Sequence, residues 1–302
     1  MTQRLRRSEL AVPGSSTKMI TKAASIGADL VFLDLEDAVA PAHKVAARAN
    51  VIAGLKDLDW GRTVRAVRVN SVDSQWAVDD VLTVVEQAGE HLDVLIIPKV
   101  KAPRDVWFFE TLLDQLEAKL GLTRKIGLEA LIEEAEALAR VEEIAACSPR
   151  LEALILGFGD LAASLGFRIG HEVDAAYRYP GDPWHEARSR MIAAARAHGL
   201  DAIDGPFPNF HDAEAYRREA SWASTLGAVG KWCIHPNQIE LANDVFAPTK
   251  NEIELARKMC AAYQAAEQGG DGAASAGGFL VDAASARIFE AVLERARRTG
   301  RI

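Results

Sequence analysis

The sequence contains little cysteine. Three residues, Cys147, Cys233 and Cys260, are scattered over 302 positions, and none forms part of a CxxC pair. An odd, dispersed set supports neither a disulfide framework nor a cysteine-based zinc cluster. This usage is typical of a reducing compartment, so we expect a cytoplasmic protein.

Long apolar runs are also absent from the sequence. None approaches the roughly 20 residues that a membrane-spanning helix requires. The basic N-terminus, MTQRLRRSEL, lacks the apolar core of a signal peptide. A formal net charge of −8 argues against nucleic-acid binding, although Arg4, Arg6 and Arg7 could hold a phosphorylated ligand. We therefore expect neither a membrane nor a nucleic acid among the partners.

What the sequence does contain is a regular alternation of strand-like and helix-like segments. Eight such units in about 245 residues match the size of a (β/α)8 barrel, and their spacing implies a parallel sheet. A doubly wound sheet is the alternative, but Pro13-Gly14-Ser15-Ser16, after the first strand, is not the GxGxxG turn of that fold. We expect a TIM barrel with strands at 8–13, 29–37, 63–70, 93–100, 125–133, 151–156, 200–205 and 228–236.

The pattern changes after residue 236 and divides the chain into two expected parts. Residues 1–245 would form the barrel domain, and residues 246–302 a C-terminal helical extension. Within the extension, the Gly-rich segment 268–278 (QGGDGAASAGG) is expected to be a flexible hinge before a last helix at 284–298. A hinge followed by a short packed element is the anatomy of a lid, or of an arm that reaches a neighbouring subunit.

Two carboxylates follow apolar, strand-like runs. Glu133 closes KIGLEALIE, and Asp160 directly follows LEALILGFG. The carboxyl ends of parallel strands are where α/β proteins place their chemistry. A helix cap is the ordinary alternative for Asp160, but two acidic groups at neighbouring strand ends can share a hard cation. The pair predicts a Mg²⁺ site, which Mn²⁺ would also fit.

Polar residues close most of the other predicted strands as well. Arg68 lies between Val67 and Val69 in an alternating strand, where arginine is rarely buried without a partner. It would either form a salt bridge to Glu36 or Asp37, or face negative charge that develops on a substrate. The remaining polar residues at strand ends are Asn70, Lys99, Asp204 and His235.

Several of these residues also have an ordinary structural interpretation. His235 precedes Pro236, where a hydrogen-bonded structural histidine is the more common outcome. Lys18 and Lys22 would usually form a solvated helix face, yet they follow a turn at which a phosphate could bind. Lys99 could bind an anion or simply end its strand. Candidate substrate-binding residues are therefore Lys18, Lys22, Glu36, Asp37, Asn70, Asp204 and His235.

Longer motifs carry more specific information. Two motifs are each specific enough to suggest a family without the others: FLDLEDAV and GKWCIHPNQI. The other motifs are VPGSS, RVN, IPKV, EALIE, LGFGDLAASLG and DAIDGP. Together they resemble the citrate lyase β-subunit family, also called the HpcH/HpaI aldolase-like family. The closer resemblance is to its malyl-CoA and citramalyl-CoA lyase branch, and it covers nearly the whole chain.

This resemblance implies a TIM-barrel enzyme that makes or breaks a carbon–carbon bond in a 3-hydroxyacyl thioester. It implies Glu133 and Asp160 as the metal ligands and Arg68 as the catalytic arginine. In the CoA-lyase branch, an aspartate on the C-terminal lid completes the site of an adjacent subunit. VDAASAR (281–287) is similar to that lid motif, so the resemblance gives this role to Asp282 and implies a homo-oligomer, a trimer or a hexamer.

The expected function is Mg²⁺-dependent cleavage of a malyl-CoA-like thioester to acetyl-CoA or propionyl-CoA and a 2-oxo acid, glyoxylate. In the reverse direction, Asp282 would remove the α-proton of the acyl-CoA and Arg68 would stabilise the enolate. The alternatives are a malyl-CoA thioesterase, a citramalyl-CoA lyase, a citrate lyase β-subunit, and a barrel that binds CoA or an acyl carrier without catalysis. One departure concerns the substrate: many family members have ETARG at Glu133, whereas Glu134-Ala135-Glu136-Ala137 follows here, which would change the acyl partner.

Overall fold

Eight parallel strands form a closed barrel in the computed structural model, which describes residues 4–168 and 179–302. The strands follow one another around the barrel in sequence order, and the last pairs with the first. The predicted (β/α)8 architecture is therefore confirmed. The chain divides into two units, Met1–Asn243 and Asp244–Ile302. In the described part of the chain, no helix is long and apolar enough to cross a membrane.

Six of the eight barrel strands are shorter than the sequence pattern predicts, and the first and sixth have the predicted bounds. The strands are β1 (Ser8–Pro13), β2 (Leu30–Asp34), β3 (Val64–Arg68), β4 (Val94–Ile97), β5 (Gly127–Ile132), β6 (Leu151–Leu156), β7 (Asp201–Asp204) and β8 (Gly230–Cys233). Most of the polar residues expected at strand ends therefore lie just beyond the strands, in the loops that leave the same end of the barrel.

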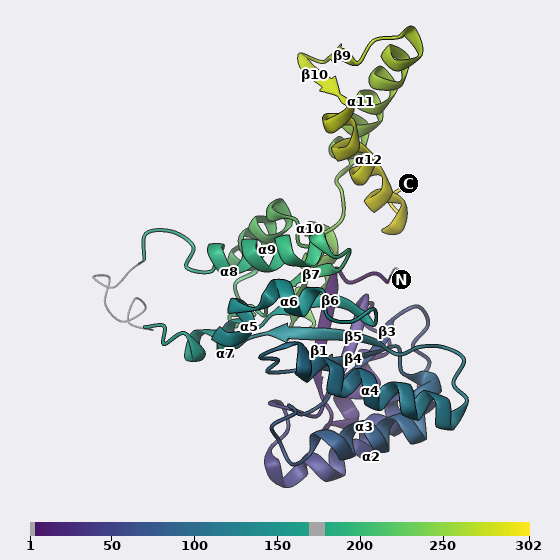
Figure 1. Ribbon diagram of the computed structural model, residues 1–302, viewed down its shortest axis with the longest axis vertical. Coiled ribbons are helices and arrows are strands. Elements are labelled where there is room, and N and C mark those ends of the chain that lie inside the picture. The colour runs from purple at the N-terminus through teal and green to yellow at the C-terminus, as the bar shows by residue number, and fades with distance from the viewer. Residues whose placement is uncertain (1–3, 169–178) are drawn as a thin grey trace. The chain divides into compact units, whose positions relative to one another are not determined.

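A helix or a pair of helices follows each barrel strand. These helices are α1 (Thr17–Ala23), α2 (Lys44–Asp57), α3 (Ala77–Ala88), α4 (Pro103–Leu120), α5 (Ala135–Ala139), α6 (Val141–Ala145), α7 (Phe158–Ser164), α8 (His185–Ala197), α9 (Ala213–Leu226) and α10 (Asn237–Val245), with short 3₁₀ turns at η1 (Pro41–His43) and η2 (Gly89–His91). Figure 1 shows α2, α3 and α4 side by side along the outside of the barrel. The single helix expected at 134–146 is two helices, because Arg140 leaves the helical region at φ −120° and ψ 20°.

The alternation of side chains along each strand places the site. Successive strand residues point to opposite faces, so residues two apart share one face. Phe32, Leu131 and Trp232 belong to one buried apolar cluster inside the barrel. The same alternation turns Asp34, two residues after Phe32, toward the barrel interior, and it does the same for Glu133 after Leu131. Polar groups thus lie above an apolar barrel core.

The first turn draws two strand ends together. Gly14 donates its backbone N–H to the carbonyl of Asp34 at 2.8 Å, and Pro13 is the register partner of Asp34. A Cβ at position 14 would lie 2.7 Å from that carbonyl oxygen. Only glycine fits this approach, which holds the loop after β1 against the end of β2.

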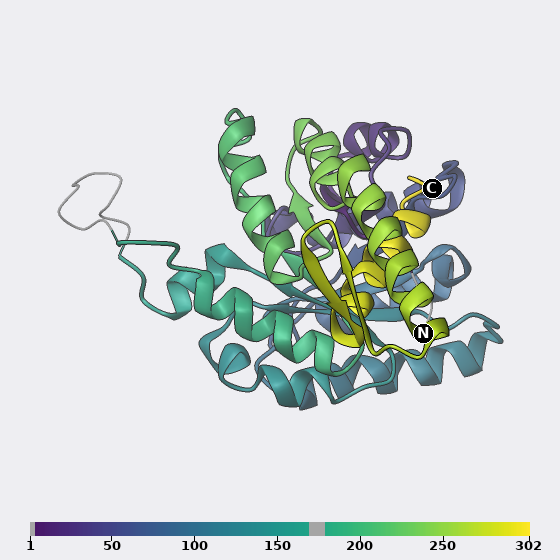
Figure 2. The same ribbon diagram turned by 90° about the horizontal axis from the view of Figure 1, so that it is seen from above.

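The second unit is a helical hairpin with a small sheet. Helix α11 (Lys250–Gly269) packs on α12 (Ala283–Arg298), and between them β9 (Ala273–Ala276) pairs antiparallel with β10 (Phe279–Asp282) (Figure 2). Met259, Val281 and Ala286 form its buried centre. The unit therefore has an apolar core of its own.

Segment 268–278, which the sequence composition predicts to be a flexible hinge, contains regular secondary structure. Helix α11 runs on to Gly269, and residues 273–276 form strand β9. Gly277 and Gly278, with φ of 59° and 83°, form the two-residue turn of a β-hairpin, since both positions need positive φ. Strand pairing uses only backbone groups, so a run of alanine and serine can form it despite a linker-like composition.

Candidate active site

A pocket of about 410 Å³ opens at the carboxyl ends of the barrel strands. It is lined by apolar groups, including Pro13, Phe158 and Trp232, and by a cluster of charged side chains. The charged lining residues are Asp34, Asp37, Arg68, Glu133 and Asp160. The structure therefore brings four of the predicted site residues, Asp37, Arg68, Glu133 and Asp160, into one cavity together with Asp34.

The guanidinium of Arg68 is held rigidly by two carboxylates. Its Nε and Nη2 donate to Asp34 Oδ1 and Oδ2 at 2.8 and 2.6 Å, and its Nη1 lies 3.1 Å from Glu36 Oε2. The same group lies over the ring of Trp232, 5.4 Å from its centroid. Burial acts against the charge, but Asp34 and Glu36 outweigh it and raise the pKa of Arg68. Arg68 is thus a fixed cation in the pocket wall.

Asp34 is the residue that orients this arginine, and it is not among the site residues predicted from the sequence. It is fully buried, and β-sheet register places it directly opposite Arg68. Its two oxygens also accept the backbone N–H groups of Glu36 and Ala38, at 2.8 and 3.0 Å. The signal was present: an aspartate in the apolar strand VFLD, on the same face as Phe32.

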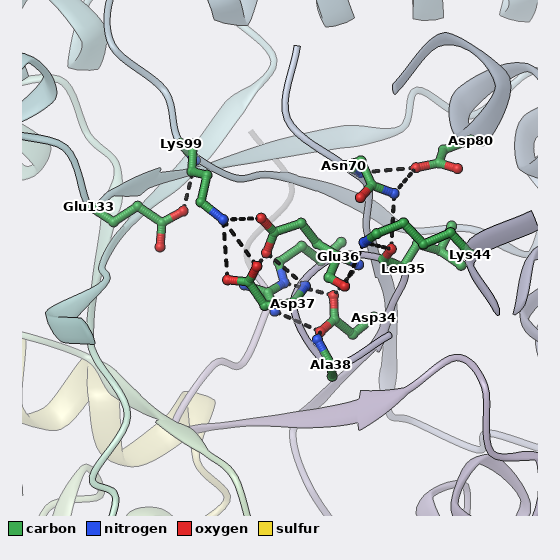
Figure 3. A network of polar contacts seen from close by, with 11 residues as sticks. Asp34, Leu35, Glu36, Asp37, Ala38, Lys44, Asn70, Asp80, Lys99 and Glu133 are labelled. Carbon is green, nitrogen blue, oxygen red and sulfur yellow. Dashed lines mark hydrogen bonds and ion pairs between the residues drawn. The ribbon is translucent and has the colours of Figure 1, made fainter. Parts of the chain in front are cut away.

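The loop after β2 carries two further carboxylates. Glu36 is buried, and burial raises its pKa despite the cations of Arg68 and Lys99 beside it. The ammonium of Lys99 contacts both Glu36 and Asp37, lying 3.1 and 3.2 Å from the two Asp37 oxygens (Figure 3). Glu36 and Asp37 are therefore paired with two cations, Arg68 at the end of β3 and Lys99 after β4.

Glu133 directly follows β5 and is 2 % exposed. Its Oε1 accepts the backbone N–H of Lys99 at 2.8 Å (Figure 3). A Cβ at Gly157 would lie 2.5 Å from Glu133 Cβ and 2.6 Å from its Oε2. The absence of a side chain at position 157 therefore makes room for this carboxylate.

Asp160 lines the same pocket and follows the next strand, β6. It lies in the first turn of α7, three residues after Gly157, and is half-buried. Burial and the nearby carboxylates Asp160 and Glu36 raise the pKa of Glu133 to about 8, although Arg68 opposes this. The pocket thus has more negative charge than its cations balance at this point.

The donor set fits a hard divalent cation. Glu133 and Asp160 supply carboxylate oxygens, which Mg²⁺ and Mn²⁺ prefer, and a cation would offset the repulsion that raises the pKa of Glu133. Within residues 4–168 and 179–302, no group of three or more His, Cys, Asp or Glu side chains could hold a metal. The chain would therefore provide two ligands, and water or ligand oxygens the remainder, as is usual for Mg²⁺.

Three predicted binding residues are engaged elsewhere. Asn70 bonds to Asp80 Oδ2 and to the carbonyl of Leu35, at 2.6 and 2.9 Å (Figure 3). Asp204 lies on the opposite strand face from Ile203, which is in the barrel interior, and it bonds to Arg188 and Lys231. The ring of His235 stacks on Phe210, and its Nδ1 accepts the backbone N–H of Asn237. None of the three lines the pocket.

Lys18 and Lys22 are exposed on α1, and neither lines the pocket.

Asp282 belongs to the second unit, where it is the N-cap of helix α12. Its Oδ1 accepts the backbone N–H and the hydroxyl of Ser285, at 2.8 and 2.7 Å. Hydrogen bonds from Ser285 lower the pKa of Asp282. Its carboxylate thus caps a helix in this structure.

Residues 7–236, the whole barrel, match the HpcH/HpaI aldolase/citrate lyase family. The chain belongs to this family. The family resemblance inferred from the sequence motifs, including its malyl-CoA lyase branch, is confirmed, and so is the prediction of a carbon–carbon lyase.

Relatives within the family support a finer comparison. The chain is 43 % identical over 299 residues to the L-malyl-CoA/beta-methylmalyl-CoA lyase of Cereibacter sphaeroides strain ATCC 17029, covering 96 % of this chain and 94 % of that protein. It is 38 % identical to the (3S)-malyl-CoA thioesterase of C. sphaeroides strain ATCC 17025, covering 91 % and 89 %. The crystal structure of CitE from Mycobacterium tuberculosis in complex with magnesium, acetoacetate and coenzyme A superimposes with a TM-score of 0.77, at 28 % identity over 97 % of this chain and 98 % of that one.

Proposed function

We propose that the protein is a Mg²⁺-dependent lyase that cleaves a malyl-CoA-like 3-hydroxyacyl-CoA into an acyl-CoA and a 2-oxo acid. The acyl-CoA would be acetyl-CoA or propionyl-CoA, and the 2-oxo acid glyoxylate. The observation that carries this proposal is the pocket that joins two carboxylates, Glu133 and Asp160, with an arginine fixed by Asp34. Identity to malyl-CoA/beta-methylmalyl-CoA lyases over nearly the whole chain supports it.

Glu133 and Asp160 would hold the cation. When bound there, Mg²⁺ supplies Lewis-acid charge that polarises the carbonyl group of a 2-oxo acid. Two features of the chain position the Glu133 carboxylate. The backbone N–H of Lys99 donates to it, and the missing side chain at Gly157 leaves space for it. The apolar wall of Phe158 and Trp232 limits water in the same cavity.

The charge of Arg68 suits the step in which the acyl-CoA carries negative charge. In the condensation direction, a base removes a proton from the carbon beside the thioester carbonyl, and negative charge passes to the thioester oxygen. Two carboxylates already hold Arg68 in place, so it stabilises that enolate without reorganising. The enolate carbon then bonds to the carbonyl carbon of the oxo acid, whose oxygen takes a proton to become the hydroxyl group. Cleavage reverses these steps.

The base in this proposal is Asp282, supplied by the second unit of a neighbouring subunit. The two hydrogen bonds that it accepts from Ser285 both go to Oδ1, and its lowered pKa keeps the carboxylate ionised at neutral pH. Phe279, Leu280 and Ile288 of the same unit are 62, 71 and 66 % exposed. Large exposed apolar side chains beside Asp282 suit contact with another subunit. Because the hairpin is ordered, the whole unit Asp244–Ile302, rather than 279–298 alone, would act as the lid.

A panel of thioesters tests the substrate. Purified protein with Mg²⁺ is given malyl-, β-methylmalyl-, citramalyl- and citryl-CoA, and the products are identified by mass spectrometry. We expect acyl-CoA and glyoxylate from the first two. Pyruvate from citramalyl-CoA alone would reassign the oxo acid, and turnover of citryl-CoA alone would indicate the citrate lyase reaction. Free CoA with malate would support the thioesterase, which is a second candidate because of the 38 % identical relative.

A further inference from the structure

Lys99 has an unusual backbone conformation. It follows β4 by two residues, and in the described ranges 4–168 and 179–302 it is the one non-glycine residue with positive φ, at 51°. A lysine in this region is strained, and the surrounding structure must offset the cost of that strain. Glycine would adopt the same conformation without this cost.

The backbone of Lys99 serves Glu133. The N–H of Lys99 donates to Glu133 Oε1 at 2.8 Å, which orients the first of the two proposed metal ligands (Figure 3). Any residue with an N–H could make this bond in the same conformation. The backbone contact therefore does not explain why a long cationic side chain occupies the position.

The side chain of Lys99 serves the other two acids. Its ammonium contacts one oxygen of Glu36 and both oxygens of Asp37, as Figure 3 shows. The second oxygen of Glu36 lies 3.1 Å from Arg68 Nη1. Glu36 is therefore engaged on both oxygens, and Asp37, which lines the pocket, is engaged as well.

The charges of the pocket would be unbalanced without this ammonium. Asp34 is neutralised by Arg68, so the loss of Lys99 would leave Glu36, Asp37, Glu133 and Asp160 facing one shared guanidinium. Such a cluster of carboxylates attracts divalent cations more strongly and offers more ligands. More oxygen ligands favour Ca²⁺, which takes six to eight, over Mg²⁺, which takes one or two carboxylates and several waters or substrate oxygens.

We propose that Lys99 is a positioning residue that keeps Glu36 and Asp37 out of the metal's ligand set, so that Glu133 and Asp160 alone hold the cation. Coordination positions thereby stay open for substrate oxygens. This inference rests on the proposed metal-dependent function. It assigns to Lys99 a role in metal selectivity and in catalytic rate, rather than in anion binding.

The test measures cation affinity without substrate. Free Mn²⁺ is titrated by electron paramagnetic resonance against the wild type, Lys99→Met and Lys99→Arg, and Ca²⁺ and Mg²⁺ are then measured by competition. We expect Lys99→Met to bind Mn²⁺ about tenfold more tightly or better, with a raised preference for Ca²⁺, because a nearby positive charge is lost. Its kcat should fall at saturating Mg²⁺, and Lys99→Arg should restore most of both properties.

Two controls accompany the titration. Lys101→Met removes a neighbouring lysine that pairs with Asp73 and does not line the pocket, so it should leave Mn²⁺ affinity near that of the wild type. Asp37→Asn keeps Lys99 and tests the same claim if Lys99→Met does not fold. Its Mn²⁺ affinity should stay within about threefold of the wild type, as for a charge that is not a ligand.

The outcomes separate the two proposals. Unchanged or weaker Mn²⁺ binding by folded Lys99→Met overturns the role of Lys99, as does a loss in Asp37→Asn as large as that in Glu133→Gln. Both results leave the metal-dependent function standing. A wild-type protein that binds no Mn²⁺ and no Mg²⁺ instead overturns the metal site itself and, with it, the role of Lys99.

Discussion

At the scale of single residues, the site depends on how neighbours fix each charge. Arg68 contributes because Asp34 and Glu36 hold all three of its nitrogens. Glu133 is suited to bind a cation because burial and the adjacent acids Asp160 and Glu36 disfavour its carboxylate when no cation is present. Both effects come from residues that touch these groups, so they can be tested by conservative substitutions.

Arg68→Lys keeps the charge but loses the planar guanidinium that donates to both oxygens of Asp34. We expect a loss of at least about 10²-fold in kcat, the scale for removing one donor to a developing oxyanion. Steady-state kinetics measures it, and Arg190→Lys, an exposed arginine that pairs with Glu142, is the matched control. An effect no larger than that of the control would make Arg68 a structural salt-bridge partner only.

The pKa of Glu133 predicts how stability depends on pH. Because its pKa in the folded protein is raised to about 8 from 4.5, the native state binds more protons than the unfolded state between these values. Without metal, the free energy of unfolding should therefore fall as pH rises through this window, by at most about 1.4 kcal/mol per pH unit from this group. Denaturant titrations of the wild type and Glu133→Gln isolate the contribution, since the variant lacks it.

Saturating Mg²⁺ should remove this decline in the wild type, because the cation binds the ionised carboxylate of the native state. The variant should respond little to Mg²⁺. Identical pH profiles of wild type and variant, with and without Mg²⁺, would contradict both the raised pKa and the assignment of Glu133 as a ligand.

At the scale of elements, strand alternation and loop geometry decide which residues meet. Periodicity predicted the eight strands, and strand ends predicted Glu133, Asp160 and Arg68, because a parallel barrel gathers these ends on one face. Asp34 was missed since β2 ends at Asp34 rather than Asp37. Asp204 was selected although alternation after Ile203 turns it outward, which the sequence could have shown.

Other features depend on tertiary contacts that no periodicity encodes. Asn70 is bound to Asp80 of α3 rather than to the pocket. Segment 273–276 forms a strand only because residues 279–282 lie beside it. The Gly-Gly turn between these segments was the local signal for a hairpin, and the overall glycine content obscured it.

The turn from β6 into α7 provides a matched pair of glycines. In Gly157→Ala, the new Cβ would lie 2.5 Å from Glu133 Cβ, so Glu133 must move and metal binding should weaken strongly. In Gly159→Ala, no atom lies within 4 Å of the new Cβ, so binding should be retained. Calorimetric titration with Mg²⁺ checks both. Equal affinities in the two variants would mean that the space at position 157 does not position Glu133.

At the scale of the whole molecule, the proposal divides one reaction between two units. The barrel carries the metal ligands and Arg68, and the second unit carries Asp282. Asp282 also caps α12, so its replacement by alanine removes a helix cap as well as a base. Asn is a good helix cap but no base, and Asp282→Asn therefore separates the two roles.

A mixing experiment tests whether subunits share a site. Asp282→Asn and Asp160→Ala should each be inactive, but subunits mixed and reassembled should regain part of the activity, because some sites combine an intact pocket with an intact Asp282. Exchange of labelled subunits verifies reassembly. A reassembled mixture without activity would refute sharing between subunits, and full activity of Asp282→Asn alone would refute its role as base.

The most direct test of the account is product analysis with malyl-CoA, with Mg²⁺ present and after its removal by a chelator. The account predicts acetyl-CoA and glyoxylate in equal amounts from the wild type with Mg²⁺, and almost none after chelation or from Glu133→Gln. Carbon–carbon cleavage that persists in Glu133→Gln, or release of free CoA and malate instead, would contradict it.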